Sequence, residues 1–209
     1  MRTVCIVQAR MGSKRLPGKV ILPLNGHTVI GEVLTRCKRI PGVDEVVCAI
    51  PLGESELRQE AEKYCRVSAG PEDDVLTRYW IAAECFDADA IMRITGDCPL
   101  ISPELCGTVL KTFKCGSGYT SNIKPRSFPK GLDCEVFTKT ALFIAYNEDD
   151  EDREHVTTFI RSSPDIYRTH VENPWPIAPE GRLCIDTEDD YRSICAAFGH
   201  APYERLRAA

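Results

Sequence analysis

The chain has 209 residues, of which 43% are apolar, and carries a formal net charge of −5 at pH 7. Its length and composition allow one full hydrophobic core, so residues 1–209 are expected to form a single domain. The acidic balance excludes broad nucleic-acid binding, because no surplus of cations exists to release the counterions of a polyanion. The sequence shows neither a signal-peptide pattern nor an apolar run of about 18 residues, which predicts a cytoplasmic protein that does not enter a membrane.

Short apolar runs alternate along the chain with segments in which apolar residues recur at helical spacing. The runs predict buried strands at Thr3–Gln8, Glu45–Ile50, Cys65–Ala69 and Ala90–Ile94. Helical faces are predicted between them, formed by Val29, Val33, Leu34, Cys37 and Ile40, then by Leu57, Ala61 and Tyr64, and then by Val75, Tyr79, Ala82 and Ala83. Repeated strand–helix units with short connections predict an α/β protein with a mainly parallel sheet, covered by helices on both faces.

The loop after the first predicted strand, Ala9–Lys19, reads ARMGSKRLPGK and holds four cations among glycine, serine and proline. Glycines let backbone N–H groups approach phosphate oxygens, and fixed cations neutralise their charge, so this loop is typical of a polyphosphate-binding site. It is not a Walker A loop, because Gly12 and Gly18 enclose five residues and Val20 stands where Ser or Thr would bind Mg²⁺. No GxGxxG follows the strand either. A solvated basic surface loop is the alternative.

Two further loops each place an aspartate after an apolar run. Asp97 lies in ITGDCPL, Ile94–Leu100, and Asp186 lies in CIDTEDDY, Cys184–Tyr191, where it is expected to end a short strand. Ligands of parallel sheets bind beyond the carboxyl ends of the strands, so both carboxylates are expected beside the cationic loop. Mg²⁺ takes one or two protein carboxylates together with water and phosphate oxygens, and the pair therefore predicts a Mg²⁺ site. Alternatively, Asp186 is a helix N-cap.

The eleven cysteines contain no CxxC pair, and most of them lie inside apolar periodic segments. Nothing in the sequence indicates export, where a disulfide framework would be expected. The cysteines are therefore predicted to be reduced and to pack as small apolar residues, without a structural zinc site.

The segments ARMGSKRLPGK, ITGDCPL and IDTEDDY resemble, in order and spacing, the cytidylyltransferases that activate acidic sugars. The spore coat polysaccharide biosynthesis protein F branch is the most similar, because GPEDDVLTRY (Gly70–Tyr79), PRSFPKGLDCEVF (Pro125–Phe137) and REHVT (Arg153–Thr157) also resemble it. The resemblance spans nearly the whole chain. It implies a Rossmann-like three-layer nucleotidyltransferase fold, a small β-containing appendage at about residues 119–157 for acceptor binding or dimerisation, and a homodimer.

The resemblance also implies a role for each motif. The cationic loop would contact a nucleoside triphosphate, most simply CTP, and Asp97 and Asp186 would hold Mg²⁺, with Mn²⁺ as a substitute. Arg15, Lys19 and Asp97 are accordingly predicted to be catalytic. Relatives usually have Pro where this chain has Glu188, which adds a charge near Asp186. The predicted nucleotide-binding residues are Gln8, Ala9, Arg10, Gly12, Ser13, Arg15, Lys19, Arg78 and Thr95.

A small anionic acceptor is expected to bind along Ser121–Thr157. A basic stretch there precedes the strand-like LDCEVF, in which polar residues alternate to one side, a pattern suited to hydroxyl and anion recognition. Arg153 and His155 are predicted to open a helix that runs to Ile160. A solvated hairpin and edge strand is the alternative interpretation. The predicted acceptor-binding residues are Asn122, Arg126, Asp133, Glu135, Arg153 and His155.

The predicted reaction is attack of an acceptor oxygen on the α-phosphate of CTP, which transfers CMP to an acidic sugar or a similar anionic metabolite and releases pyrophosphate. Three alternatives remain open: a GT-A type glycosyltransferase that uses a nucleotide sugar, a guanylyltransferase that uses GTP, and a sensor or scaffold that binds a nucleoside triphosphate without turnover. Asp87 and Asp89 form a DxD pair, a metal signature of many glycosyltransferases. They precede the strand Ala90–Ile94 and are expected at the opposite edge of the sheet.

Overall fold

The structure is a computed structural model that describes residues 1–148, 152–174 and 180–199. Its strands are β1 (Thr3–Gln8), β2 (Pro23–Leu24), β3 (His27–Thr28), β4 (Glu45–Pro51), β5 (Arg66–Gly70), β6 (Ala90–Thr95), β7 (Tyr119–Ser121), β8 (Glu135–Thr138) and β9 (Arg168–His170). Its helices are η1 (Lys19–Ile21), α1 (Val29–Cys37), α2 (Ser55–Glu62), α3 (Val75–Cys85), α4 (Pro103–Phe113), α5 (Lys139–Asn147), α6 (Thr158–Ser162) and α7 (Glu188–Ala197). Within the described ranges, no helix is long and apolar enough to cross a membrane.

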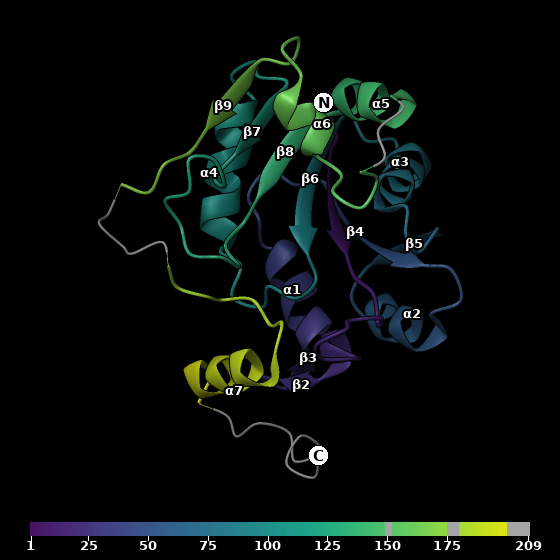
Figure 1. Cartoon of the computed structure of the whole chain (residues 1–209), viewed down its shortest axis with the longest axis vertical. Coiled ribbons are helices and arrows are strands. Elements are labelled where there is room, and N and C mark those ends of the chain that lie inside the picture. The colour runs from purple at the N-terminus through teal and green to yellow at the C-terminus, as the bar shows by residue number, and fades with distance from the viewer. Residues whose placement is uncertain (149–151, 175–179, 200–209) are drawn as a thin grey trace.

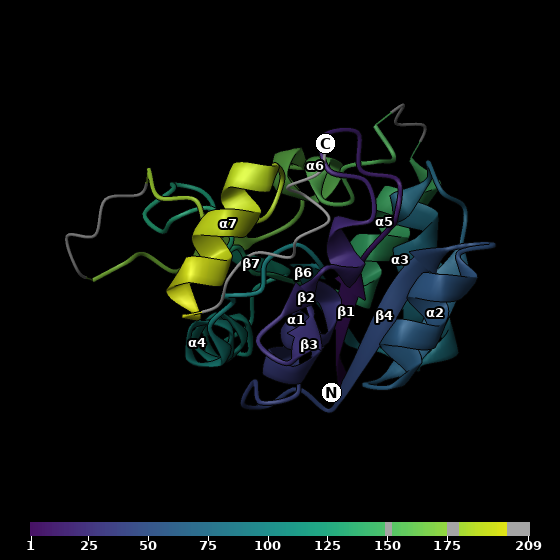
Figure 2. The same ribbon diagram turned by 90° about the horizontal axis from the view of Figure 1, so that it is seen from below.

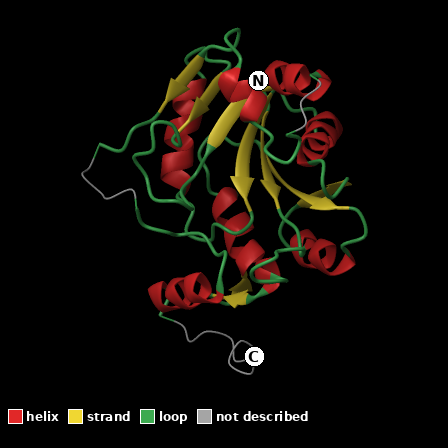
Figure 3. Cartoon of the chain, in the orientation of Figure 1, coloured by secondary structure: helices red, strands yellow, loops and turns green. Residues whose placement is uncertain are grey.

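Seven strands form one sheet in the order β5-β4-β1-β6-β8-β7-β9 (Figures 1 and 3). The strands β5, β4, β1 and β6 run parallel, β8 is antiparallel to both β6 and β7, and β9 is parallel to β7. The central strand β1 is buried on both faces, and this explains why it reads as a continuous apolar run rather than an alternating one. The predicted α/β fold with a mainly parallel sheet is confirmed.

Helices cover both faces of this sheet. Cys5 and Val7 of β1 pack toward α1, α2 and α4, whereas Val4 and Ile6 pack toward α3, α5 and α6, because successive side chains of a strand alternate between its faces. Figure 2 shows α1 and α4 on one side of the sheet and α3 and α5 on the other. The predicted three-layer arrangement is therefore confirmed.

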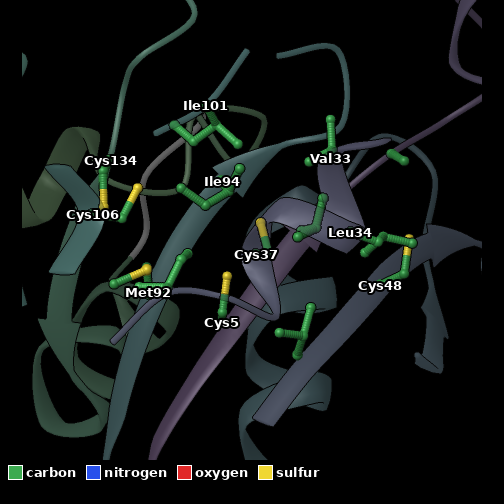
Figure 4. Packing of buried hydrophobic residues seen from close by; sticks show 14 of the residues in the cluster. Cys5, Val33, Leu34, Cys37, Cys48, Met92, Ile94, Ile101, Cys106 and Cys134 are labelled. Atoms are coloured by element: carbon green, nitrogen blue, oxygen red, sulfur yellow. The ribbon is translucent and has the colours of Figure 1, made fainter. Parts of the chain in front are cut away.

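Cysteines make up a large part of the core between the sheet and α1 and α4. Cys5, Cys37, Cys48, Cys106 and Cys134 are fully buried in this cluster, among leucine, isoleucine and valine side chains (Figure 4). All eleven cysteines are free thiols. Burial raises the pKa of Cys48 well above its usual value, which keeps this thiol protonated. Most of the cysteines thus act as small apolar residues, as predicted.

The predicted boundaries agree with β1, β4, β5 and β6 to within one residue at each end. Residues 119–157, predicted as an appendage, supply β7 and β8 to the main sheet. The prediction that a helix begins with Arg153 and His155 is wrong, because α6 begins only after these residues. Asp152 accepts hydrogen bonds from the backbone N–H of His155 at 3.2 Å and from Thr158 Oγ1 at 2.9 Å, which holds the intervening residues in a turn.

The segment that leads to Asp186 is not a strand, contrary to the prediction. It meets two loops rather than a strand edge, so that only isolated hydrogen bonds form: Leu183 N donates to Lys130 O at 2.7 Å, and Ile185 N donates to Asp97 O at 2.8 Å. Asp186 is not the N-cap of α7 either. Thr187 caps this helix in a capping box with Asp190. Tyr191 and Ile194 of α7 are buried and pack against Leu24 of β2 and Val29 at the start of α1.

Gly131 sets how closely the chain before Asp186 approaches the loop that precedes β8. Its φ is +101°, and a Cβ built on it would lie 2.4 Å from the backbone carbon of Leu183. We expect Gly131→Ala to lower the free energy of unfolding by about 1–2 kcal/mol through backbone strain and by about a further 1–3 kcal/mol through displacement of Leu183. Urea unfolding measures this loss.

Gly116→Ala is the matched control, because Gly116 has a φ of +111° and no atom lies within 4 Å of the position that a Cβ would take there. It should lose only the strain contribution of about 1–2 kcal/mol. Equal losses for the two variants would contradict the close-approach role assigned to Gly131.

Candidate active site

A cavity of about 370 Å³ opens where β1 and β6 end, and the cationic loop and both aspartate loops border it. These strands are parallel, so their carboxyl ends lie at the same edge of the sheet. Helix α3 contributes two side chains from the neighbouring layer. The lining residues are Gln8, Ala9, Arg10, Ser13, Lys14, Arg15, Lys19, Val20, Val75, Arg78, Thr95, Gly96, Asp97, Glu154 and Asp186.

The ammonium group of Lys19 lies between the two aspartates. Its Nζ donates hydrogen bonds to Asp97 Oδ2 at 2.6 Å, to Asp186 Oδ1 at 2.9 Å and to the backbone oxygen of Ile185 at 2.5 Å. These three bonds use all the donors of the ammonium group. Gly18 precedes η1 with a φ of 69°, a left-handed conformation that glycine adopts without strain. The glycine of the motif therefore turns the chain into the short helix that carries Lys19.

Charge pairing outweighs burial at Lys19. Burial alone would lower the pKa of its ammonium group, but the carboxylates of Asp97 and Asp186 raise this pKa above the usual value. Burial alone would likewise raise the pKa of Asp186, but Lys19, Arg182 and Arg15 hold it below the usual value. The lysine and Asp186 are therefore both charged at neutral pH, in a site where only 9% of the Lys19 side chain is exposed.

Two arginines bind the outer oxygen of Asp186. Arg15 lies 3.0 Å from Oδ2, and Arg182 donates to the same atom at 2.7 Å. Arg182 also contacts Asp190, whose pKa falls to about 2 because these hydrogen bonds and those of two backbone N–H groups outweigh the effect of its burial. The orientation of Asp186 is thus determined by Lys19 on one side and by Arg15 and Arg182 on the other.

Glu54, which precedes α2, holds the backbone of the cationic loop in place. Met11 N donates to Glu54 Oε1 at 2.8 Å, and burial raises the pKa of this carboxyl group. The second oxygen of Glu54 is buried without a hydrogen-bond partner among the described residues. At the cavity, Arg10 forms an exposed ion pair with Glu154 at 3.0 Å. Such an ion pair contributes little to stability and is easily replaced by a ligand.

Arg78 of α3 brings a buried cation to the same cavity. It is 2% exposed, and one guanidinium nitrogen donates to the backbone oxygens of Pro71 at 2.8 Å and Glu72 at 2.7 Å. Its Nε is buried without a partner among the described residues. A buried donor without a partner is unfavourable unless a ligand accepts from it, which makes Arg78 a candidate for contact with a bound nucleotide.

The predicted nucleotide-binding residues line this cavity, with the exception of Gly12. A Cβ on Gly12 would lie 3.2 Å from Glu72, so this glycine allows the loop to pack closely instead. Sequence reasoning missed Lys14, Val20, Val75, Gly96 and Glu154 among the lining residues and Arg182 behind Asp186. Lys14 could have been predicted, because it lies among the other cations of the cationic loop. Nothing in the sequence distinguishes Glu154 from its acidic neighbours.

None of the predicted acceptor-binding residues lines the cavity. Asn122 is 1% exposed and ties two loops together, since its side chain accepts from Cys134 N at 2.8 Å and donates to Leu132 O at 2.7 Å. Arg126 and Asp133 form a bidentate pair with both distances at 2.9 Å. These residues therefore contact one another in the structure, and contact of any of them with an acceptor stays a prediction.

The remaining acceptor candidates also have protein partners. Arg153 donates to Asp74 at 2.7 Å, and the exposed His155 lies 2.8 Å from Asp152. Glu135 is 2% exposed and pairs with Arg93. Burial alone would raise the pKa of Glu135, but Arg93 and two hydroxyl donors hold it below the usual value. Its carboxylate accepts from Arg93, Tyr119 and Thr157 inside the protein, and its contact with an acceptor stays a prediction.

A Rossmann-like sheet whose carboxyl edge carries a cationic loop and two carboxylates defines an α/β protein of the nucleotidyltransferase class. Comparison with known families agrees with this class, because a family model described as cytidylyltransferase matches residues 4–200. The chain belongs to this cytidylyltransferase family, and the resemblance seen in the sequence motifs is confirmed.

Individual relatives are consistent with this assignment. The spore coat polysaccharide biosynthesis protein SpsF of Bacillus subtilis is 35% identical over 209 residues, which cover 94% of this chain and 86% of the relative. A 3-deoxy-manno-octulosonate cytidylyltransferase of Anaeromyxobacter is 30% identical over 59% of this chain and 52% of its own length. A solved cytidylyltransferase structure from Leptospira borgpetersenii superposes with a TM-score of 0.89 at 29% identity, covering 95% of this chain and 87% of that one.

Glu135→Gln tests whether the buried pair with Arg93 supports the sheet. We expect a loss of about 3 kcal/mol in the free energy of unfolding at pH 7, because removal of one partner leaves a buried charge uncompensated. The pKa of Glu135 is lowered in the folded state, so its contribution is present above the unfolded pKa of about 4.3 and is lost as the pH falls through the folded value. Urea unfolding should show a constant difference between variant and wild type from pH 7 down to the unfolded pKa of about 4.3, and a shrinking difference as the pH falls further through the folded pKa. A difference that stays constant below that pH as well would contradict the ionised pair.

Proposed function

We propose that this protein transfers CMP from CTP to an acidic sugar or a comparable anionic metabolite and releases pyrophosphate. The observation that carries the proposal is the position of Lys19 between Asp97 and Asp186 in the cavity of a cytidylyltransferase fold. The acidic acceptor is supported by relatives that are named for a deoxy-octulosonate substrate and for polysaccharide biosynthesis.

The cations of the loop would bind the triphosphate. Arg10, Lys14 and Arg15 line the cavity, and Arg10 and Arg15 are held by ion pairs that are largely open to solvent. When phosphate oxygens replace these partners, the same cations neutralise the negative charge that builds up on the leaving pyrophosphate. Lys19 is buried and has three partners of its own, so its part is to fix the two aspartates and to supply a positive charge beside the reacting phosphate.

We also propose that Asp97 and Asp186 hold a Mg²⁺ ion when nucleotide is bound. The donor set fits, because Mg²⁺ takes one or two carboxylates and fills its other positions with water and phosphate oxygens. Asp97 Oδ1 is suited to this role, since the one hydrogen bond it accepts within the described residues is a 3.5 Å bond from the Cys98 thiol. The ion would supply charge neutralisation and alignment of the phosphates.

Two further expectations remain proposals. We propose that the enzyme works in the cytoplasm, since its cysteines are free thiols, which is typical of a reducing compartment. A homodimer, implied by the resemblance, stays a prediction. The glycosyltransferase alternative loses its main support, because Asp87 and Asp89 lie before β6 and therefore at the edge of the sheet opposite to the cavity.

The proposed reaction is tested by incubating the protein with Mg²⁺, each of the four nucleoside triphosphates and a panel of anionic sugars, and following pyrophosphate. We expect release only with CTP and an acidic sugar. Release with GTP would favour the guanylyltransferase alternative. Binding of a triphosphate without pyrophosphate release for any pair would favour a sensor or scaffold.

Asp97→Asn tests the role of the carboxylate beside Lys19. We expect kcat for pyrophosphate release to fall by about 10²–10³, since removal of one preorganised electrostatic group from an active site has this effect. The KM for CTP should change little, because the loop cations remain. Asp87→Asn is the matched control: it makes the same change at the opposite edge of the sheet, at an exposed residue with a φ of 50° that Asn tolerates. Equal kcat values for the two variants would overturn the assignment of Asp97.

A further inference from the structure

A second pocket, of about 270 Å³, lies on the α3, α5 and α6 side of the sheet, over β7 and β9. We call it the cationic pocket, because Lys124, Arg161, Arg168 and His170 line it and no acidic residue does among the described residues. It shares no lining residue with the cavity that holds Lys19. Nothing in the proposed reaction at Lys19 uses it.

Register explains why the basic side chains gather here. Tyr119 pairs with Arg168 and Ser121 pairs with His170 across β7 and β9, and residues opposite each other in a sheet project from the same face. Arg161 approaches from α6 above this face, and it lowers the pKa of the buried Glu135 carboxyl group together with other groups. Strand β7 and the more distant segment that holds α6 and β9 thus direct cations and the Ser121 hydroxyl group into one pocket.

Two of these cations form no direct contact with a carboxylate of the described residues, although Arg161 acts electrostatically on the buried Glu135. The side chains of Lys124 and Arg161 form no ion pair or hydrogen bond in the described part of the chain, whereas His170 contacts Glu172 at 3.1 Å and Arg168 donates to the backbone oxygen of Ser163. Cations collected around a pocket repel one another, and a bound anion relieves this repulsion through charge-assisted hydrogen bonds. The hydroxyl group of Ser121 at the same pocket suits a ligand that also carries hydroxyl groups.

A row of polar side chains joins this pocket to the cavity of Lys19. Gln8 lines that cavity and accepts from Arg93 Nε at 3.2 Å, and Arg93 pairs in turn with Glu135. Glu135 Oε1 accepts from Tyr119 Oη at 2.5 Å and from Thr157 Oγ1 at 2.8 Å, and Tyr119 lines the cationic pocket. The row crosses β1, β6, β8 and β7 on one face of the sheet, so a largely buried polar network links the two sites.

We propose that the cationic pocket binds an anionic group, a carboxylate or a phosphate, at the end of the acceptor remote from its reacting oxygen. This proposal rests on the proposed function, which places the reacting phosphate beside Lys19, Asp97 and Asp186. Strand β7 lies two positions from β6 in the sheet, which is about 10 Å at the usual strand spacing, and Ser121 is level with Arg93, so the offset along β6 to Asp97 adds to this separation. An anionic group next to the reacting carbon could not reach that far, whereas the far end of a sugar acid could.

Lys124→Gln combined with Arg161→Gln tests the proposal with two probes, 3-deoxy-manno-octulosonate and its 8-phosphate ester. The ester carries an additional anion at the end remote from the reacting carbon, so we expect it to have the lower KM in the wild type. The double variant should raise the KM of the ester about 10- to 100-fold, the effect of losing charge-assisted hydrogen bonds, and should leave the KM of CTP within about twofold. The matched control is Lys38→Gln with Lys111→Gln, which removes two exposed cations that form no ion pair within the described ranges. Equal KM values for the ester in the two double variants would overturn the proposal.

A binding measurement separates this inference from the proposed function. The imidazole signal of His170 is followed by NMR, assigned with His170→Asn, while each probe is added without CTP. A shift produced by the ester and abolished in the Lys124→Gln, Arg161→Gln variant supports the pocket even if no probe is turned over, a result that would contradict the proposed function alone. A shift produced equally by inorganic phosphate, with an unchanged KM for the ester in the variant, would identify a free-anion site and overturn the acceptor role. The absence of any shift would overturn it as well.

Discussion

The ion pairs of Lys19 join three parts of the chain that are far apart in sequence. The cationic loop after β1, the loop after β6 and the segment before α7 meet at one ammonium group, which is 9% exposed and uses all its donors. Without that charge, Asp97 and Asp186 would face each other as like charges, which is unfavourable in a partly buried site. The geometry of the cavity therefore depends on this lysine, and so does the path of the chain between Arg182 and α7.

The sheet supplies the other half of the site. Parallel strands β1 and β6 end at the same edge and present their following loops to one cavity. On the α3 side of the sheet, an apolar face is interrupted by the buried pair of Arg93 and Glu135, which is satisfied by Gln8, Tyr119 and Thr157. Such a network is stable only when all its members are paired. It connects the cavity to the cationic pocket through the interior of the protein.

Much of the fold was predictable from local patterns. Apolar runs marked β1, β4, β5 and β6 because these strands are buried and short. The path around Asp186 was not predictable, because the apolar run before it packs on loops and makes only isolated hydrogen bonds. The start of α6 was missed for a similar reason, since the side chain of Asp152 holds the preceding residues in a turn.

The sequence by itself determined the class of the fold, the cationic loop and the two aspartates, because each depends on residues that are close along the chain. The tertiary structure decided which charged groups remain available to ligands. Glu135 and Asp133 looked alike in the sequence, yet one is buried against Arg93 and the other binds Arg126. Strand order is the physical reason: β8 lies between β6 and β7, and partners across neighbouring strands come from distant parts of the chain. The sequence pattern of one segment therefore does not predict which distant side chains will lie beside it.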